Sequence, residues 1–525
     1  MGACQRRTDH LQTHMASDTT TADVKANSRI PPELIRRLEE SERRLNLLEA
    51  QISSAKTALD VLHRQRDEEI IRLSKLRNAT APHSKLPPEM LAEIFEHYIS
   101  DPIVIRSKHT PGAVSPLVLS QICSTWRAVA MGTPTLWNKV LVKCDDWQDA
   151  KELVDRAHKY LERSGSSLVT LYSSGPGSHP YMQSYPLPLT FEAGSKLIQD
   201  FIEPYTSRLQ SLKLSFPSSW LQHFLSVSAG DEWFFPHLQS VDMVYNSGEY
   251  GESSHKESID FFVNAPLLSH FKLVAGNHSA YLRSTSYLLP WSQLIDLHLF
   301  RINVPMPALP ALLSSCTSLS SCTLTVMKEY LAPDSLITIP TLRSLTLHNP
   351  HNFDYNKYLE SLAFPSLSHL SVLLYDGRNG TKWSHAQFTA LLARSACTLT
   401  SLHTTAHIEH ADIEAVLGDV PSLIELDVQR GQPVSTSTLR FICNGLMAPS
   451  LEVIKCVVEP GMLNDFLDML DCRHVPHKSQ AVYRGIKKAV MRCDMQSGEY
   501  EGVLERLREL RACARDVTVE DRWVG

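Results

Sequence analysis

A hexapeptide pattern, Leu-x-x-Leu-x-Leu, recurs ten times in this chain of 525 residues, with later positions substituted in some copies. Successive copies begin 23 to 32 residues apart. In an extended strand, alternate side chains point to opposite faces, so the last two leucines of each copy share one face. A unit of this size buries that face only against neighbouring copies. The copies begin at Leu209, Leu238, Leu268, Leu294, Leu319, Leu342, Leu367, Leu399, Leu423 and Leu451.

This period and pattern resemble those of leucine-rich repeats, in which strand-plus-helix units stack into a solenoid. The resemblance implies an α/β fold in which residues 139–525 form the solenoid. Segments 387–393 and 412–417, which lie between hexapeptides, have helical spacing. Asn is usual at the third position after the hexapeptide, but only Asn246 provides it, so the expected solenoid is irregular. An ordinary α/β domain with leucine-rich strands is the alternative.

The ends of this region have their own patterns. We expect a strand at 140–142, a helix over about 149–163 and a strand at 168–171. From about residue 461 the pattern becomes mostly helical, and Val517 and Val519 alternate as in a final strand. Terminal repeats cover the exposed end of a repeat core, so this last stretch is interpreted as a cap.

The segment from Leu86 to Trp137 is rich in apolar residues at helical spacing. It begins with LPPEMLAEIFEHYI and resumes, after a polar loop, with PLVLSQICSTWRAVAMGTPTLW. The prolines at 87 and 88 favour a helix start, and Pro134 cannot continue a helix. About 50 residues cannot bury this much apolar surface alone, so the segment needs a partner.

These residues resemble an F-box motif. The resemblance rests on Leu86-Pro87-Pro88-Glu89, Ile94-Phe95, Val118-Leu119, Cys123-Ser124-Thr125-Trp126-Arg127 and Pro134-Thr135-Leu136-Trp137. It implies a small all-α F-box unit over residues 84–138 that docks onto the Skp adaptor of a cullin-based ubiquitin ligase. A buried helical hairpin of a larger domain is the alternative. The partner-binding residues implied by the resemblance are Leu86, Pro87, Ile94, Phe95, Leu117, Leu119, Cys123 and Trp126. The connection from Ser100 to Ser115 is longer than is usual in the family, although loop insertions cost little.

The N-terminal region divides into two parts. Residues 1–29 are polar and aperiodic, which is typical of disorder. Residues 33–78 carry apolar residues at two heptad positions, a pattern that predicts a coiled coil. Arg66 and Glu69 interrupt this seam. A homodimer formed through residues 38–76 is one interpretation, and a helix folded back on its own chain, or a solvated spacer, is the other.

Composition limits the function classes. The net charge is −6, which does not favour nucleic acid or an anionic membrane surface as a partner. The N-terminus lacks a secretory pattern and no apolar run reaches membrane-spanning length. The eleven cysteines form no CxxC pair, which favours buried free thiols in a reducing compartment over a disulfide framework. We therefore expect an intracellular protein, cytoplasmic or nuclear.

No motif indicates catalysis or a cofactor. The segment Gly175-Pro176-Gly177 lacks the Lys-Ser/Thr of a phosphate loop, and no GxSxG sequence is present. Two groups could ligate zinc if the chain brought them together. They are His403, His407, His410 and Asp412, and Cys472, His474 and His477. Neither has a paired structural-zinc spacing, so we expect surface histidines, no metal and no enzymatic activity.

The resemblance thus implies a substrate-recognition subunit of a Skp-cullin-F-box ubiquitin ligase, whose solenoid binds an unidentified protein target. A non-degradative coiled-coil and leucine-rich-repeat scaffold is the alternative. The residue between the last two apolar positions of each hexapeptide points away from the core. The face that these residues form suits a protein or peptide partner, and a merely solvated face is the alternative. These residues are Lys213, Asp242, Lys272, His298, Thr323, Thr346, Ser371, His403, Asp427 and Lys455.

Overall fold

The protein is described here by a computed structural model that forms two compact units, residues 1–86 and residues 87–525. The described residues are 31–80, 85–107, 115–144, 146–174, 190–217, 220–221, 223–224, 233–246, 260–275, 280–281, 289–303, 308–325, 336–349, 359–374, 382–428, 430–473, 484–493, 501–512 and 516–521. The predicted disorder over residues 1–29 lies outside these ranges.

The first unit contains one long helix, α1, Pro32–Thr80. Its 49 residues correspond to a length of about 74 Å at the usual rise per residue. The helix predicted over 33–78 is therefore confirmed. Its apolar side chains stay exposed, because one helix in isolation has nothing against which to bury them.

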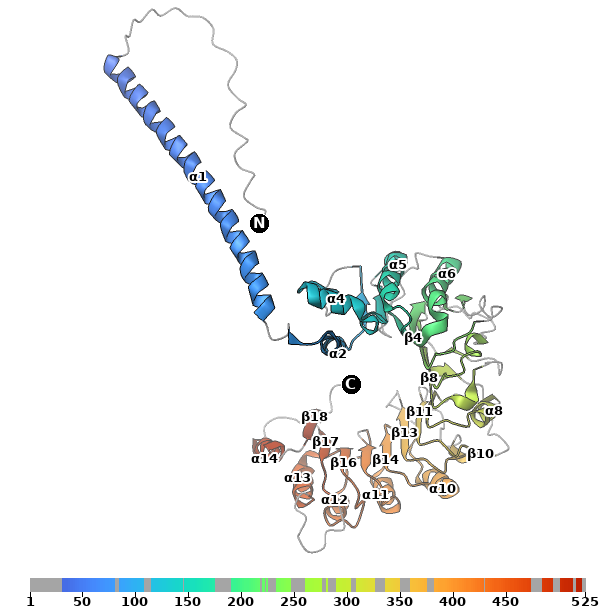
Figure 1. The fold of residues 1–525 in the computed structure, drawn as a ribbon. Coiled ribbons are helices and arrows are strands. Elements are labelled where there is room, and N and C mark those ends of the chain that lie inside the picture. Colours follow the sequence, from blue (N-terminus) through green and yellow to red (C-terminus); the bar gives the residue numbers. More distant parts are fainter. Residues whose placement is uncertain are drawn as a thin grey trace, which may run out of the picture. The chain divides into compact units, whose positions relative to one another are not determined.

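The second unit is a mixed α/β structure built on a large parallel sheet (Figure 1). Sixteen strands belong to this sheet, and along its main path the strands follow chain order, with β7, β10 and β12 left out. Strand β7 pairs only with β8, and β10 and β12 form a separate parallel pair. The strands are β1 Ile103–Ile105, β2 Lys139–Lys143, β3 Val169–Ser174, β4 Leu209–Pro217, β5 Ser240–Asn246, β6 His270–Ala275, β7 Ala280–Tyr281, β8 Asp296–Asn303, β9 Ser321–Thr325, β10 Ile337–Thr338, β11 Ser344–Asn349, β12 Leu362–Ala363, β13 His369–Leu374, β14 Ser401–Thr404, β15 Glu425–Val428, β16 Val453–Val457, β17 Lys488–Cys493 and β18 Asp516–Asp521.

Helices connect many of these strands. In Figure 1 the helices α5, α6, α8 and α10 to α13 lie along one side of the sheet. The helices of this unit are α2 Pro88–Tyr98, α3 Pro116–Ser120, α4 Ser124–Gly132, α5 Ala150–Leu161, α6 Phe191–Ile202, α8 Ala308–Ser315, α10 His385–Ser395, α11 His410–Asp419, α12 Thr436–Cys443, α13 Leu463–Cys472 and α14 Glu501–Ala512. Short 3₁₀ turns are η2 Pro134–Trp137, η3 Trp147–Asp149, η4 Glu162–Ser164, η5 Glu203–Arg208, η6 Asp260–Phe262, η7 Trp291–Gln293 and η8 Pro460–Met462.

Each of the ten hexapeptides provides one strand of the large sheet. In the first copy Leu209, Leu212 and Leu214 are fully buried, whereas Lys213 between the last two is exposed. The first leucine of every copy is at most 1% exposed. Parallel pairing in chain order stacks these leucines from strand to strand, so the core runs along the whole sheet.

Five strands of the described residues were not anticipated from the sequence, namely β1, β7, β10, β12 and β17. Strand β1 lies inside the connection that was expected to be a loop, and it pairs with β2 with Ile103 and Ile105 buried. Strand β17 divides the C-terminal stretch that was expected to be mostly helical. The predicted strands and helix at 140–171 are confirmed as β2, α5 and β3, and β18 confirms the final strand.

Candidate partner-binding surfaces

Helix α2 has two apolar faces. Leu91 and Phe95 are buried at 2% and 1% exposure, and they fix the helix to the core of the second unit. Met90, Ile94 and Tyr98 follow one another at intervals of four residues and are 48%, 46% and 62% exposed. Four residues are about one helical turn, so these three side chains form a continuous exposed stripe. The helical spacing in the sequence suggested one apolar side for all five residues. The structure instead divides them between a buried side and an exposed side of the helix.

Helices α3 and α4 hold the second part of the motif. The Cys123 side chain caps α4, because its Sγ accepts a hydrogen bond from the backbone N–H of Trp126 at 3.4 Å. The Trp126 ring in turn packs against Phe95, with ring centroids 4.8 Å apart. Ser115 caps α3 by accepting from Leu117 N at 3.3 Å. These contacts hold α4 against α2.

Further apolar side chains are exposed on the same two helices. Val118 on α3 is 51% exposed, and Met131 on α4 is 43% exposed. Ile122, between the two helices, is 48% exposed. Together with the exposed stripe of α2, these residues are called the α2–α4 surface.

The eight residues expected to bind a partner differ in exposure. Phe95 and Leu119 are 1% and 4% exposed, so they pack in the core of this chain and a partner cannot contact them directly. Leu86 is 36% exposed and is the last residue of the first unit. In the second unit, Pro87 and Ile94 are exposed, and Leu117, Cys123 and Trp126 are half-buried.

The ten outward residues of the hexapeptides form one row across the sheet. Strand register pairs Lys213 with Asp242 and Asp242 with Lys272, and the same register continues without a break to Asp427 and Lys455. The intermediate pairs also match, from Lys272 with His298 to His403 with Asp427. We call this set the open-face row. The register thus places the ten residues side by side, but Thr323 and Asp427, which were also expected to point away from the core, are buried at 9% and 6% exposure.

Charges in the open-face row alternate and pair. The carboxylate of Asp242 lies 3.4 Å from Lys213 Nζ and 3.7 Å from Lys272 Nζ. Near the other end, Asp427 is 6% exposed and lies 3.2 Å from Lys455 Nζ. Burial lowers the pKa of Lys455, but its acidic neighbours outweigh that effect and hold its pKa above the ordinary value. The row is thus largely neutralised, which fits a protein surface better than a polyanion as a partner.

An aromatic and histidine group lies beside the middle of the row. The rings of Phe300 and His348 meet edge to face, with centroids 4.6 Å apart. The Arg301 guanidinium lies 5.5 Å from the Phe300 ring centroid, and its backbone has a left-handed φ of 57°. The register between β8 and β9 shifts at this point. Irregular strands with a positive φ often re-aim side chains at binding sites. We call His298, Phe300, Arg301 and His348 the open-face cluster.

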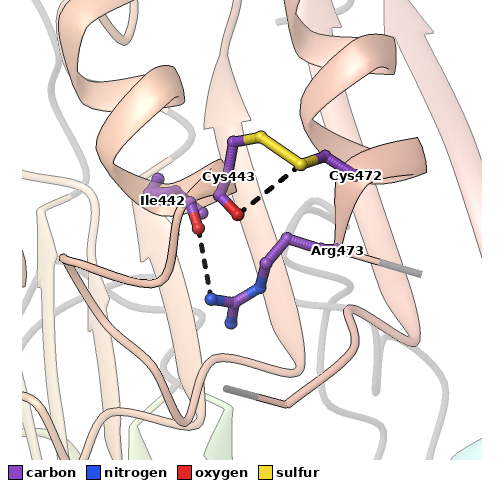
Figure 2. The surroundings of a disulfide bond; sticks show 4 residues. All are labelled: Ile442, Cys443, Cys472 and Arg473. Atoms are coloured by element: carbon purple, nitrogen blue, oxygen red, sulfur yellow. Dashed lines mark hydrogen bonds between the residues drawn. A yellow bond between two sulfur atoms is a disulfide. The ribbon is translucent and has the colours of Figure 1, made fainter. Parts of the chain in front are cut away.

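Two groups were considered as possible zinc ligands, and neither was expected to bind metal. Among the described residues, no three His, Cys, Asp or Glu side chains are arranged to hold a metal ion. His474 and His477 lie outside the described ranges. Cys472 is joined to Cys443 by a disulfide bond, so its sulfur is not a free ligand (Figure 2).

This disulfide corrects the expectation of free thiols alone. It links the C-terminal ends of α12 and α13, which neither cysteine spacing nor count indicated. Arg473, 1% exposed, lies beside it and donates from its guanidinium to the carbonyl oxygen of Ile442 at 3.2 Å (Figure 2). It also donates to the carbonyl oxygen of Leu451 at 3.0 Å. Buried thiols such as Cys316 and Cys322 do remain outside any disulfide.

No family model matches the chain, and no curated protein matches it. A solved structure of a Bacteroides fragilis protein is similar at 13% sequence identity, over 63% of this chain and 72% of that chain, with a TM-score of 0.26. At that TM-score the likeness supports no inference about function. None of the helices in the described part of the chain is both long and apolar enough to cross a membrane.

Proposed function

We propose that this protein is the substrate-recognition subunit of a Skp-cullin-F-box ubiquitin ligase. Residues 84–138 act as the F-box that docks onto the Skp adaptor. The parallel sheet and its helices act as an irregular leucine-rich-repeat solenoid that binds a protein target. Ubiquitin transfer is carried out by other subunits, and this chain contributes by holding a target lysine near the conjugating enzyme.

The observation that carries this proposal is the second apolar face of α2. A surface helix of a globular protein normally buries one apolar stripe and exposes polar residues opposite it. Helix α2 buries Leu91 and Phe95 but exposes Met90, Ile94 and Tyr98. Contiguous exposed apolar side chains mark interaction sites, because burying them against a partner removes them from water. These residues lie within the segment that resembles an F-box.

The open-face row supports the target-binding part of the proposal. Parallel sheets usually have both faces covered, but here one face carries a row of polar side chains, eight of which are at least partly exposed. The open-face cluster adds an aromatic ring and a cation beside that row, and such groups are enriched at protein interfaces. A protein segment lying across the strands would contact both.

The adaptor interaction is tested by co-purification of the full-length protein with a Skp adaptor. The variant Ile94→Asp/Val118→Asp places two charges on the α2–α4 surface without removing a core side chain. We expect it to keep its thermal unfolding midpoint and to lose affinity by at least about tenfold, since desolvating one carboxylate exceeds 1.4 kcal/mol.

A matched control is Phe441→Asp/Leu446→Asp, which changes two exposed apolar residues at 39% and 72% exposure near the other end of the sheet. This control should bind the adaptor normally. Failure of the folded wild-type protein to bind any Skp adaptor contradicts the proposal.

The scaffold alternative makes a different prediction in cells. If the protein is a ligase receptor, depleting it should stabilise a bound protein, and Ile94→Asp/Val118→Asp should not reverse that effect. The half-life of the bound protein can instead stay the same after depletion and with the variant, although the wild type binds the adaptor. The protein is then a non-degradative scaffold.

A further inference from the structure

Helix α1 exposes a regular apolar seam. Fourteen large apolar side chains are exposed on this helix. Nine of them fall at two of the seven heptad positions, where an even distribution would place about four. The seam residues are Leu34, Leu38, Leu45, Leu48, Ile52, Leu59, Leu62, Leu73 and Leu76. A seam repeating every 3.5 residues is complementary to another helix with the same repeat.

Charges beside the seam favour a second copy in the same orientation. In a parallel, in-register pair, charged residues that flank the seam face each other across the two helices. The residue just before the first seam position on one helix faces a residue of the other helix, namely the one just after the second seam position of the same heptad. This places Arg37 opposite Glu42 of the other copy and Arg44 opposite Glu49. Each pair forms twice, so the N-terminal half gains four opposite-charge contacts. Arg72 opposite Arg77 is the unfavourable pair at the other end.

The antiparallel arrangement is less favourable. It places Arg66 against Leu48 and Glu69 against Leu45, so that two charged side chains disrupt layers that would otherwise be apolar. It also sets Arg37 against Arg72. The parallel arrangement confines Arg66 and Glu69 to two neighbouring layers. In a two-stranded coil their long stems can still extend their charges to solvent.

We propose that α1 forms a parallel, in-register, two-stranded coiled coil with a second copy of this chain. The protein is therefore a homodimer that carries two copies of the second unit on the same end of the coil. This inference goes beyond the proposed ligase function and does not depend on it, because α1 lies outside the residues assigned to adaptor or target binding.

The first test measures the mass of the purified full-length protein by light scattering after size exclusion. We expect twice the chain mass for the wild type and a single chain mass for Leu45→Asp/Leu48→Asp. The matched control, Leu47→Asp/Val61→Asp, changes two apolar residues of 61% and 41% exposure that lie outside the seam, and it should stay dimeric. A monomeric or trimeric wild type, or a dimer that survives the seam substitutions, overturns the proposal.

The second test measures orientation by disulfide trapping. Ser41 lies at a seam position, so Ser41→Cys should give a covalent dimer under mild oxidation in a parallel pair. Ser53→Cys, outside the seam, should give no more than the wild-type background. Trapping only in Ser41→Cys/Leu73→Cys, and not in Ser41→Cys, would show an antiparallel pair and refute the stated geometry.

The two proposals fail separately in these experiments. The monomeric Leu45→Asp/Leu48→Asp variant should still bind the adaptor one to one through the α2–α4 surface. A wild-type dimer that binds no adaptor refutes only the ligase function, and a monomer that binds the adaptor refutes only the coiled coil.

Discussion

At the residue scale, Gly194 allows helix α6 to pack closely against Trp220 because glycine has no side chain. A Cβ atom added at Gly194 would lie 2.1 Å from the fully buried Trp220 ring. The indole cannot move aside without disturbing the core, so Gly194→Ala should lower the free energy of unfolding by about 1–3 kcal/mol. Gly418, in helix α11, has no atom within 4 Å of an added Cβ.

Gly418→Ala is therefore the control, and it should be neutral or stabilising by about 0.5–1 kcal/mol, since alanine restricts the unfolded chain. Urea unfolding of both variants measures the difference. Equal effects of the two substitutions would show that α6 does not pack on Trp220 as described.

The open-face cluster should make stability depend on pH. Burial, together with the smaller effects of His298 and Arg301, lowers the pKa of His348 from its ordinary value of 6.5 to about 4. Above pH 6.5 the histidine is neutral in both states. Between pH 6.5 and 4 the unfolded chain takes up a proton that the folded protein does not, so stability falls as the pH falls.

We expect the wild type to lose roughly 3 kcal/mol more than His348→Leu between pH 7 and pH 4. Urea unfolding at both pH values checks this. Carboxylates titrate in both proteins, so only the difference between them reports on His348. Parallel losses in the two proteins would mean that the histidine titrates normally.

At the scale of elements, the sequence was most informative where one pattern repeated. The ten hexapeptides located their strands and the open-face row because alternation in a strand fixes which side chains are buried. The strands β1, β7, β10, β12 and β17 were missed. In β1 only three residues, Ile103–Ile105, form the strand, and in β17 Ala489 and Met491 replace the leucines of the pattern.

Helix α2 shows why the candidate site was only partly predictable. Met90, Leu91, Ile94, Phe95 and Tyr98 are all apolar and spaced for a helix. Spacing alone cannot say which of two adjacent stripes meets the core and which stays exposed. That choice depends on Trp126, 31 residues after Phe95, which packs against Phe95 from helix α4. The division therefore comes from tertiary packing.

The link between α12 and α13 gives a third prediction. The disulfide closes a loop between residues 29 positions apart, which restricts the unfolded chain. Cys443→Ala/Cys472→Ala should lower the free energy of unfolding by about 2–4 kcal/mol under non-reducing conditions. With reductant present, wild type and variant should unfold alike, apart from small packing differences. A wild type whose stability does not respond to reductant would argue against the bond, as would two titratable thiols at these positions.

At the scale of the whole molecule, the division into two units predicts independent folding. The second unit, from Pro87 on, contains the continuous core, and α1 lies in the first unit. A protein lacking residues 1–80 should keep its thermal unfolding midpoint within about 2 °C, because none of the described side chains of α1 belongs to that core. At the usual unfolding entropy per residue, a shift of about 2 °C corresponds to roughly 2 kcal/mol in a unit of this size. Calorimetry measures it. A large drop would show that the core depends on the N-terminal segment.

The strand order of the large sheet also has a consequence for synthesis. Along its main path every strand after the first pairs with an earlier strand, and of the described strands only the short β7, β10 and β12 come between such partners in the chain, so the partner has already left the ribosome when each strand emerges. Domains fold as units during translation, starting from the N-terminus. The sheet can therefore grow one strand at a time, with each new repeat covering the edge left by the last. A pause in translation would leave one unpaired edge, and that edge is where a nascent chain of this kind would recruit a chaperone or aggregate.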